Sequence, residues 1–539
     1  MPSTSRRKPA AKSDFISSRL RRPLAAAASG ILLSLSFPSA GLWPLVFVAL
    51  VPLLVVLHHD SPGPGATAAT PRGARWAPWI AGIVFNAVLF SWIVRLPAHA
   101  MTHPWLIFPG LLALALYLGL FMALFGWIVR LVRRRLGWPV LAAAPIAWAA
   151  SEWARSSGVL GCPWGNVGYA LAEHPAWIQA ASLAGAPGLS FWILVTNSLV
   201  AAAAVSRRWW ARAAWVILAL LVVWLPVRWG ETRLREPRGR PLARVALVQP
   251  SIPSDVKWNP ALQDSVVGTL ARMTRVAASL MPRPNLIVWP ETALPYYVRL
   301  ERVKLKAFVD LVREAGVPVL AGYPDARLSN NGSVLTYNAA GLVLPNGTFG
   351  GQYEKIHLVP FGERVPFQGL LPFLGKIDLG QAEWTPGTRP VVFTAGGSSF
   401  GVLICFESIF PSLARRYALE GAQYLVNITN DEWFGKSAGP VQHAEMAILR
   451  SVELGLSTAR CANTGVSMLI DPYGRVVERT PLFKEALLTG DVWVGAGPTL
   501  FLQWGDWVTS LCLGLTLILV VISWYRPLQR LGTALTPKG

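Results

Sequence analysis

The sequence predicts an α/β domain inserted into a bundle of eight membrane-spanning helices. Its 539 residues are 53% hydrophobic and only 14% charged, which is too apolar for a soluble enzyme of this length. Long apolar runs lie towards the two ends of the chain, and each can cross a hydrocarbon core about 30 Å thick. Between about 244 and 492 charged residues return and the apolar runs shorten to strand length, which is typical of a water-exposed domain with its own core.

The apolar runs divide the chain into five parts. We expect membrane spans at residues 24–37, 41–57, 76–95, 105–129, 138–154, 176–204, 213–229 and 502–524. The predicted parts are a basic cytoplasmic tail at 1–23, seven helices within 24–229, a linker at 230–243, the α/β domain at 244–495, and the eighth helix with a second cytoplasmic tail at 496–539. The first span is short and also resembles a cleaved signal peptide, but the six spans that follow favour an uncleaved helix.

Lysine and arginine in the short loops predict the orientation of the chain. They gather in the N-terminal tail and after the second, fourth and sixth spans, whereas the other loops are nearly free of them. Because these residues accumulate on the cytoplasmic side, the α/β domain is predicted to lie outside the cytoplasm. The formal net charge of +21 then reflects topology and contact with anionic headgroups, and we expect no nucleic-acid partner.

Within 244–495, short apolar runs alternate with helical stretches. Strands are predicted at 245–248, 286–289, 318–321, 334–344, 348–353, 400–404 and 424–428. A polar helical stretch precedes residue 279, and a second helix is predicted at 303–315. Continuous apolar runs of this kind belong to strands that are covered on both faces. The pattern therefore predicts a layered α/β domain.

Three strands of this domain end at a reactive side chain. Pro290 stops one strand just before Glu291, Lys355 ends the second arm of a hairpin, and a third strand runs straight into Cys405. A carboxylate can act as a base, an ammonium can stabilise an oxyanion, and a thiolate is a strong nucleophile. Their common position at strand ends predicts one catalytic site.

Each of these residues also has an ordinary interpretation. A lone Glu after a strand is usually a solvated turn residue, a lone Lys lies on the surface, and a lone Cys belongs to the core. A disulfide between Cys405 and Cys461 is a further alternative in an oxidising compartment. With Cys162 and Cys512, the cysteines show no metal-ligand spacing, so no metal site is expected.

The order Glu, Lys, Cys in one α/β domain resembles the nitrilase superfamily, whose fold is an α-β-β-α sandwich. The whole chain resembles the apolipoprotein N-acyltransferases of Gram-negative bacteria. The strings that carry this resemblance are CPWGNVGY from Cys162, VALVQPSIPSDVKW from Val245, WPETALP from Trp289, HLVPFGE from His357, CFE from Cys405 and NDEWFGKSAGPVQH from Asn430. One departure is that the family commonly has Tyr after the nucleophilic Cys, where this chain has Phe406.

The resemblance implies a ping-pong acyl transfer without a cofactor. Glu291 would take the proton of Cys405, and Lys355 with the backbone N–H of Phe406 would hold the oxyanion. A phospholipid would leave its acyl group on Cys405 as a thioester. The N-terminal amine of a diacylglyceryl-cysteine apolipoprotein would then accept it, which is the last step of bacterial lipoprotein maturation.

The resemblance also implies supporting roles, a location and partners. Glu363 and Glu407 would support the triad. The residues expected to bind substrate are Trp164, Trp258, Trp433 and Phe434, for which interfacial anchoring is the alternative. The protein is expected to be a monomer in the bacterial inner membrane, with its catalytic domain in the periplasm and with phospholipid and apolipoprotein as partners.

Two other functions are compatible with parts of the sequence. A membrane-anchored nitrilase or amidase would use the same triad to hydrolyse a small nitrogen compound, but it would not need eight spans. A transporter or scaffold with an inactive domain would carry ionisable residues along its spans. The main candidates for such residues are Glu152 and Arg155, near the end of one span.

Overall fold

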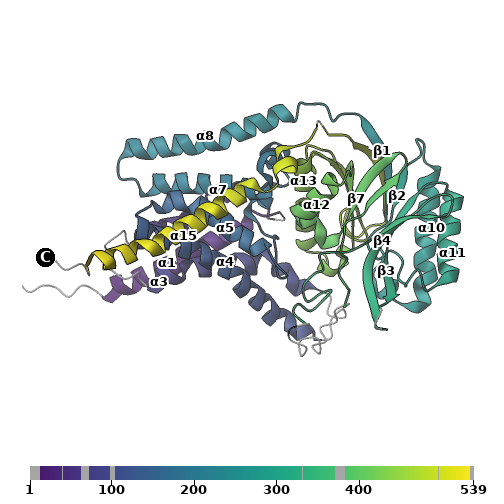
Figure 1. Ribbon diagram of the computed structural model, residues 1–539, viewed down its shortest axis with the longest axis horizontal. Coiled ribbons are helices and arrows are strands. Elements are labelled where there is room, and N and C mark those ends of the chain that lie inside the picture. Colours follow the sequence, from purple (N-terminus) through teal and green to yellow (C-terminus); the bar gives the residue numbers. More distant parts are fainter. Residues whose placement is uncertain are drawn as a thin grey trace, which may run out of the picture.

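The computed structural model describes residues 12–38, 40–61, 72–96, 103–329, 332–368, 370, 383–495 and 497–534. A helical bundle and an α/β domain lie end to end along the long axis of the molecule (Figure 1). The tail residues Arg6, Arg7 and Lys8, on which the prediction of a basic N-terminus partly rests, lie outside the described residues.

Helices coincide with each of the eight predicted spans. The elements of the bundle are α1 (Lys12–Leu35), η1 (Trp43–Phe47), α2 (Val51–Asp60), α3 (Arg72–Leu89), η2 (Ser91–Arg95), η4 (Pro104–Leu106), α4 (Ile107–Leu136), α5 (Val140–Ser156), α7 (Ala181–Val205), α8 (Trp209–Arg233) and α15 (Trp507–Ala534). Small residues let these helices approach closely. A Cβ on Gly82 of α3 would lie 2.8 Å from the Cα of Gly119 in α4, so only glycine fits there.

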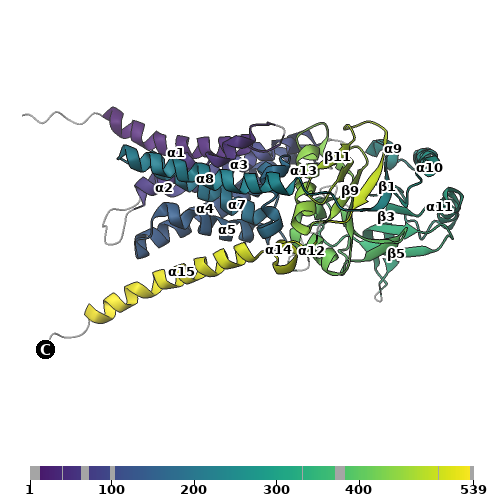
Figure 2. The same cartoon turned by 90° about the horizontal axis from the view of Figure 1, so that it is seen from above.

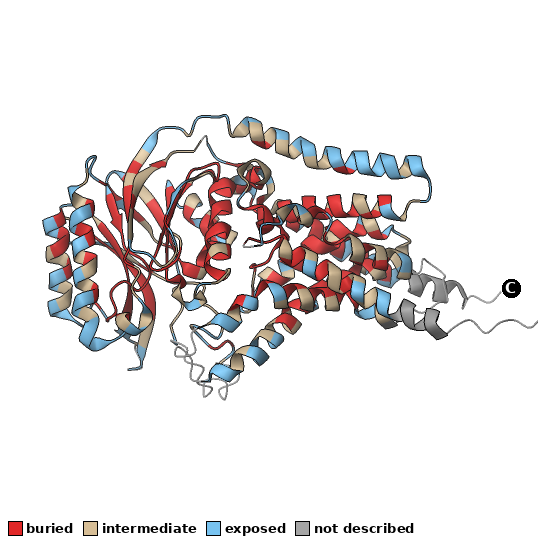
Figure 3. Ribbon diagram, turned by 180° about the vertical axis from the view of Figure 1, so that it is seen from behind, coloured by how far each residue is buried: buried red, intermediate tan, exposed pale blue. Residues whose placement is uncertain are grey.

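Among the described residues, six helical segments are long and apolar enough to cross a membrane. They are Trp43–Asp60, Gly73–Arg95, Pro104–Leu136, Ala181–Val205, Trp209–Arg233 and Trp507–Tyr525. The helices at the other two predicted spans are α1 and α5. Both are packed into the bundle, since α1 contacts α3 and α5 contacts both α4 and α7. By contrast, α8 lies along the outside with most of its apolar surface exposed (Figure 3).

The α/β domain contains two six-stranded sheets. The first has the order β12-β1-β2-β3-β4-β5 and the second has the order β11-β10-β9-β8-β7-β6. Their strands are β1 (Pro241–Gln249), β2 (Leu286–Val288), β3 (Val319–Leu328), β4 (Val334–Val343), β5 (Phe349–Glu354), β6 (Val392–Ala395), β7 (Ser398–Ile404), β8 (Tyr424–Thr429), β9 (Ser457–Ala462), β10 (Met468–Ile470), β11 (Val476–Arg479) and β12 (Ala486–Trp493). In each sheet three neighbouring strands are parallel, namely β1, β2 and β3 in the first and β7, β8 and β9 in the second.

Helices cover the outer faces of both sheets. Apolar residues of α10 (Gln263–Ser279) and α11 (Arg302–Ala315) form one core with the first sheet, and a second core lies between the two sheets. On the other side lie α12 (Pro411–Leu419) and α13 (Gly439–Leu454), between the second sheet and the bundle (Figure 2). The predicted α-β-β-α sandwich joined to a helical bundle is confirmed.

A buried ion pair within helix α13 (Gly439–Leu454) contacts the bundle. Arg450 Nε lies 2.8 Å from Glu453 Oε2, and both side chains are fully buried. Glu453 Oε1 also accepts a hydrogen bond of 2.8 Å from the N–H of Ala186. That N–H is free because α7 is kinked at Gly185, whose φ is 68°. The pair therefore ties a helix of the α/β domain to the kink in α7.

This ion pair provides a test of the junction. Glu453→Gln keeps the acceptor for Ala186 but leaves the Arg450 cation unpaired, which costs about 3–5 kcal/mol at buried sites. We expect a clearly lower melting temperature in detergent. The double variant Arg450→Met with Glu453→Gln removes the orphaned charge and should recover most of the loss. If the loss of stability in the double variant equalled the sum of the losses in Glu453→Gln alone and Arg450→Met alone, this account would be contradicted.

Candidate active site

Three strand ends bring the predicted catalytic side chains together. Glu291 follows β2, Lys355 follows β5, and Cys405 follows β7. All three are at least nine-tenths buried. Cys405 has a φ of 52° and Thr292, next to Glu291, has a φ of 46°. Such conformations are unfavourable for residues other than glycine and are held in place only by the surrounding structure.

A buried lysine is paired with two carboxylates. Lys355 Nζ lies 2.8 Å from Glu363 Oε1 and 3.4 Å from Glu291 Oε1. Burial alone lowers the pKa of Lys355, but the charges of Glu363 and Glu291 outweigh it and hold the pKa above its ordinary value. The ammonium is therefore charged at neutral pH and is available to stabilise a developing negative charge.

The carboxylate of Glu291 is held by two asparagines. Asn338 Nδ2 donates to Glu291 Oε1 at 2.7 Å, and it also contacts Glu363 Oε1 at 3.2 Å. The backbone N–H of Asn430 donates to Glu291 Oε2 at 2.8 Å. Each oxygen of Glu291 thus has a fixed donor, and the carboxylate is fixed in orientation.

A second buried lysine supports the turn after Glu291. Lys257 Nζ donates to the hydroxyl of Thr292 at 2.8 Å and to the carbonyl of Glu291 at 3.3 Å. Burial lowers the pKa of Lys257 to about 8, against the opposing effect of the Glu291 charge. These bonds hold the positive-φ conformation of Thr292.

The thiol of Cys405 is neutral before reaction. Burial and the nearby Glu291 charge raise its pKa well above the ordinary value, although Lys355 acts in the opposite direction. A neutral thiol beside an ionised carboxylate is the arrangement required for general-base activation. All four cysteines are unpaired, so the alternative of a Cys405–Cys461 disulfide is wrong.

Glu407 holds the backbone around the site. Its carboxylate accepts hydrogen bonds from the hydroxyl of Tyr353 at 2.6 Å and from the backbone N–H groups of Ile356, His357 and Ile404 at 2.7, 3.1 and 2.7 Å. Burial raises the pKa of Glu407 to about 7, against the lowering effect of these donors. The residue thereby connects the segment after Lys355 to the segment before Cys405.

A buried polar cluster lies next to Cys405. Asp431 Oδ1 is 2.8 Å from His443 Nδ1, and Asp431 Oδ2 is 2.8 Å from Arg460 Nη2. Burial would raise the pKa of Asp431, but Arg460 and His443 hold it at about 2. By distance, Cys405, Asp431 and His443 could hold a metal ion. The Arg460 guanidinium already neutralises Asp431 and repels a cation, so this donor set does not suit a metal.

The predicted substrate-binding aromatics fall into two groups. Trp258 and Trp433 are 42% and 46% exposed. Trp164 is buried, with ring centroids 5.7 Å from Phe434 and 5.5 Å from His443. The ring of Phe406 lies 5.2 Å from that of Phe410, in an edge-on contact.

Several residues of the site were not anticipated from the sequence. They are Lys257, Asn338, Asn430, Asp431, His443 and Arg460. Lys257, Asn430, Asp431 and His443 stand within strings that carry the family resemblance, and this was the available signal. Asn338 and Arg460 lie in the middle of ordinary strands, where nothing in the local sequence marks them.

Two family models match the chain. The model described as carbon-nitrogen hydrolase matches residues 244–496, and the model described as apolipoprotein N-acyltransferase N-terminal domain matches residues 29–199. An apolipoprotein N-acyltransferase of Geobacter metallireducens is 35% identical, with 95% of this chain and 97% of that protein covered. Another apolipoprotein N-acyltransferase, from Azotobacter vinelandii, is 34% identical, with 90% of this chain and 92% of that protein covered.

Solved structures also resemble part of the chain. An amidase from Nesterenkonia is 18% identical with a TM-score of 0.37, and the match covers 51% of this chain and 98% of that chain. Nit3 of Saccharomyces cerevisiae, a member of branch 10 of the nitrilase superfamily, is 20% identical with a TM-score of 0.37. The match covers 48% of this chain and 93% of that chain.

A close backbone contact provides a test of how Glu291 is placed. A Cβ on Gly322 of β3 would lie 2.5 Å from the carbonyl oxygen of Pro290 and 2.7 Å from the Cα of Glu291. Gly322→Ala should therefore displace Glu291, and a shift of about 1 Å can slow a reaction about a hundredfold. Gly268→Ala in α10 is the control, because its Cβ meets nothing within 4 Å. Equal activity in both variants would contradict this placement.

The raised pKa of Cys405 predicts how its alkylation depends on pH. Only the thiolate reacts with iodoacetamide. Since the folded pKa lies well above the ordinary value, the alkylation rate should rise steadily from pH 7 to pH 9 without reaching a plateau. Lys355→Met removes a charge that lowers this pKa and should slow alkylation further. A plateau below pH 8, measured by mass spectrometry of the Cys405 peptide, would indicate a preformed thiolate instead.

Proposed function

Because this chain belongs to the apolipoprotein N-acyltransferase family, we propose that Cys405 carries a fatty acyl group from a phospholipid to the N-terminal amine of an apolipoprotein. The acceptor would be the diacylglyceryl-modified cysteine at that N-terminus. One observation supports this assignment most directly. A neutral buried thiol, an ionised carboxylate and a charged ammonium meet in a domain packed against a bundle of apolar helices.

The first half-reaction forms a thioester. Glu291 takes the proton of Cys405, and the sulfur attacks the ester carbonyl carbon of the phospholipid. The carbonyl oxygen becomes an oxyanion, which Lys355 and the backbone N–H of Phe406 stabilise. The ester C–O bond then breaks, and the lysophospholipid leaves with the proton that Glu291 returns.

The second half-reaction uses the same groups in the same places. The amine nitrogen attacks the thioester carbonyl, and Glu291 accepts a proton from the amine. The C–S bond breaks, an amide forms, and the proton passes to the departing sulfur of Cys405. Glu363 remains paired with Lys355 through both steps and keeps the ammonium in position.

The aromatic residues suggest how lipid chains reach the sulfur. The exposed indoles of Trp258 and Trp433 stand on short helical segments that are tied together, since Ser254 donates to Glu432 through its N–H at 2.5 Å and its hydroxyl at 2.6 Å. We assign these indoles to the rim of the approach. Trp164 and Phe434, packed against the bundle, form its base. Trp residues at such a boundary also suit the bilayer interface.

The charge pattern supports a location in the inner membrane. Arg133, Arg134 and Arg135 lie in the last turn of α4. With such basic residues in the cytoplasm, the catalytic domain would face the periplasm, where apolipoproteins present their modified cysteine. The chain holds all the catalytic groups that we assign, so a monomer without a cofactor suffices for the reaction.

The thioester is the direct test of this function. The purified full-length protein is incubated with a phospholipid that carries a labelled acyl chain, and the Cys405 peptide is analysed by mass spectrometry. We expect one acyl group on Cys405 that hydroxylamine removes. An apolipoprotein with a free diacylglyceryl-cysteine amine should remove it as well and should become labelled.

Matched variants separate the steps and the alternative functions. Cys405→Ala should form no adduct, whereas Glu291→Gln and Lys355→Met should slow its formation at least about a hundredfold. Ammonia release from small amides, without transfer to an apolipoprotein, would instead indicate a hydrolase. Lipoprotein maturation that persists in Cys405→Ala would indicate that the domain is not catalytic.

A further inference from the structure

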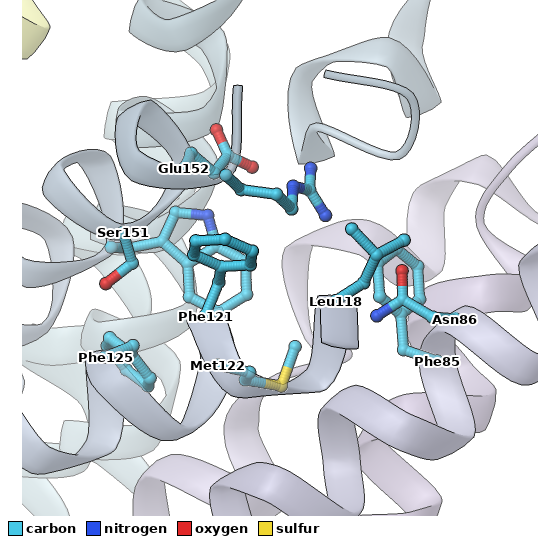
Figure 4. Close-up of a pocket in the computed structure, with 10 residues that line it drawn as sticks. Phe85, Asn86, Leu118, Phe121, Met122, Phe125, Ser151 and Glu152 are labelled. Atoms are coloured by element: carbon cyan, nitrogen blue, oxygen red, sulfur yellow. The ribbon is translucent and has the colours of Figure 1, made fainter. Parts of the chain in front are cut away.

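A small cavity within the helical bundle is lined by polar as well as apolar side chains. Its volume is about 20 Å³, and its wall includes Asn86 of α3 together with Trp148, Glu152 and Arg155 of α5. Figure 4 shows Asn86 and Glu152 on opposite sides of this cavity. More than nine-tenths of each of these four residues is buried. The cavity is therefore a polar site inside an otherwise apolar bundle.

Four buried polar atoms on the wall of this cavity have no hydrogen-bond partner within the described part of the chain. They are Asn86 Oδ1, Trp148 Nε1, Glu152 Oε2 and Arg155 Nε. The two oxygens accept hydrogen bonds, and the two N–H groups donate them. Buried polar atoms in folded proteins are nearly always paired, either with the protein or with ordered water. A ligand of this cavity must therefore be able both to donate and to accept.

Size and charge restrict the ligand further. The cavity of about 20 Å³ is slightly larger than the roughly 10–15 Å³ that one water molecule needs, and it is too small for an organic molecule. A cation would meet the guanidinium of Arg155, and an anion would meet the carboxylate of Glu152. Water is small and neutral, and it offers both kinds of hydrogen bond.

We propose that this cavity is a binding site for internal water. The water donates to Asn86 Oδ1 and to Glu152 Oε2. It accepts hydrogen bonds from Trp148 Nε1 and from Arg155 Nε. Apolar cavities of this kind stay dry, whereas polar ones hold water that has about two to four partners. The site does not depend on the proposed acyl transfer.

The amide group of Asn86 is fixed for this role. Its Nδ2 donates at 2.7 Å to the carbonyl of Gly82, one turn earlier in α3. This bond uses the donor end of the amide inside its own helix and leaves Oδ1 as the acceptor for water. The water thereby links α3 to the side chains of α5.

The remaining atoms of Glu152 and Arg155 hold the segment that follows α5. Glu152 Oε1 accepts a hydrogen bond of 2.8 Å from the N–H of Val167, and Arg155 donates to Asn166. Trp164 lies in this segment, and its indole packs against α13 of the catalytic domain. The water therefore completes the hydrogen bonding of two residues that fix this segment. Such a role accounts for two ionisable side chains inside a helical bundle.

Radiolysis of bound water tests the proposal. The purified full-length protein in detergent receives a brief X-ray pulse, which converts water into hydroxyl radicals where it is bound, and mass spectrometry locates the modified side chains. Phe125 lines the cavity, whereas Phe308 lies in the core beside the first sheet, and both are 1% exposed. We expect Phe125 to be modified at least about tenfold faster than Phe308, because only Phe125 lies beside bound water. Trp148 and the buried Trp289 provide a second pair with the same expectation.

A substitution of nearly equal size removes the acceptor of α3. Asn86→Leu places an apolar side chain at the cavity, so modification of Phe125 should fall to the rate of Phe308. Val88→Leu, on the exposed face of the same helix, is the control and should keep the native rate. Hydrogen exchange provides a second measurement. The amide of Val167, which is bonded to Glu152, should exchange at least about tenfold faster in Asn86→Leu than in Val88→Leu.

Three results would overturn the proposal. Equal modification of Phe125 and Phe308 in the native protein would show a dry cavity, and this result needs no variant to fold. Undiminished modification of Phe125 in a folded Asn86→Leu variant would place the water away from Asn86. Unchanged exchange at Val167 in that variant would show that the water does not support the segment that carries Trp164.

Discussion

A lysine ammonium buried between two carboxylates is the interaction on which the site depends. An isolated buried cation costs several kcal/mol, so Lys355 requires both Glu363 and Glu291 at their observed distances of 2.8 and 3.4 Å. The pairing gives the two carboxylates different tasks. Glu363 neutralises the ammonium at close range, whereas Glu291, farther from it and held by Asn338 and a backbone N–H, is the carboxylate suited to accept a proton from sulfur.

The same site couples the catalytic domain to the membrane bundle. Between them lies α13, which carries His443 next to Cys405 and the Arg450–Glu453 pair beside the kink of α7. A rigid connection of this kind suits a reaction whose two substrates are both held in the bilayer. The bundle therefore packs against the active site, where Trp164 stacks on His443.

Much of the fold could be predicted, because local patterns decide strands and helices. The helix expected at 303–315 is α11 at Arg302–Ala315, and the strands expected at 334–344 and 348–353 are β4 and β5. Strand ends likewise marked Glu291, Lys355 and Cys405. The contacts of Asn338 with Glu291, and of Trp164 with His443, join residues far apart in the chain, so no local pattern could reveal them. Only the packing of the two sheets and the bundle creates these contacts.

The most direct test of the account is an experimental structure of the acylated protein, with its acyl group on Cys405. We expect the thioester carbonyl oxygen to lie about 3 Å from both Lys355 Nζ and the backbone nitrogen of Phe406. A carbonyl oxygen that points away from both groups, with Lys355 bonded only to Glu363, would contradict it.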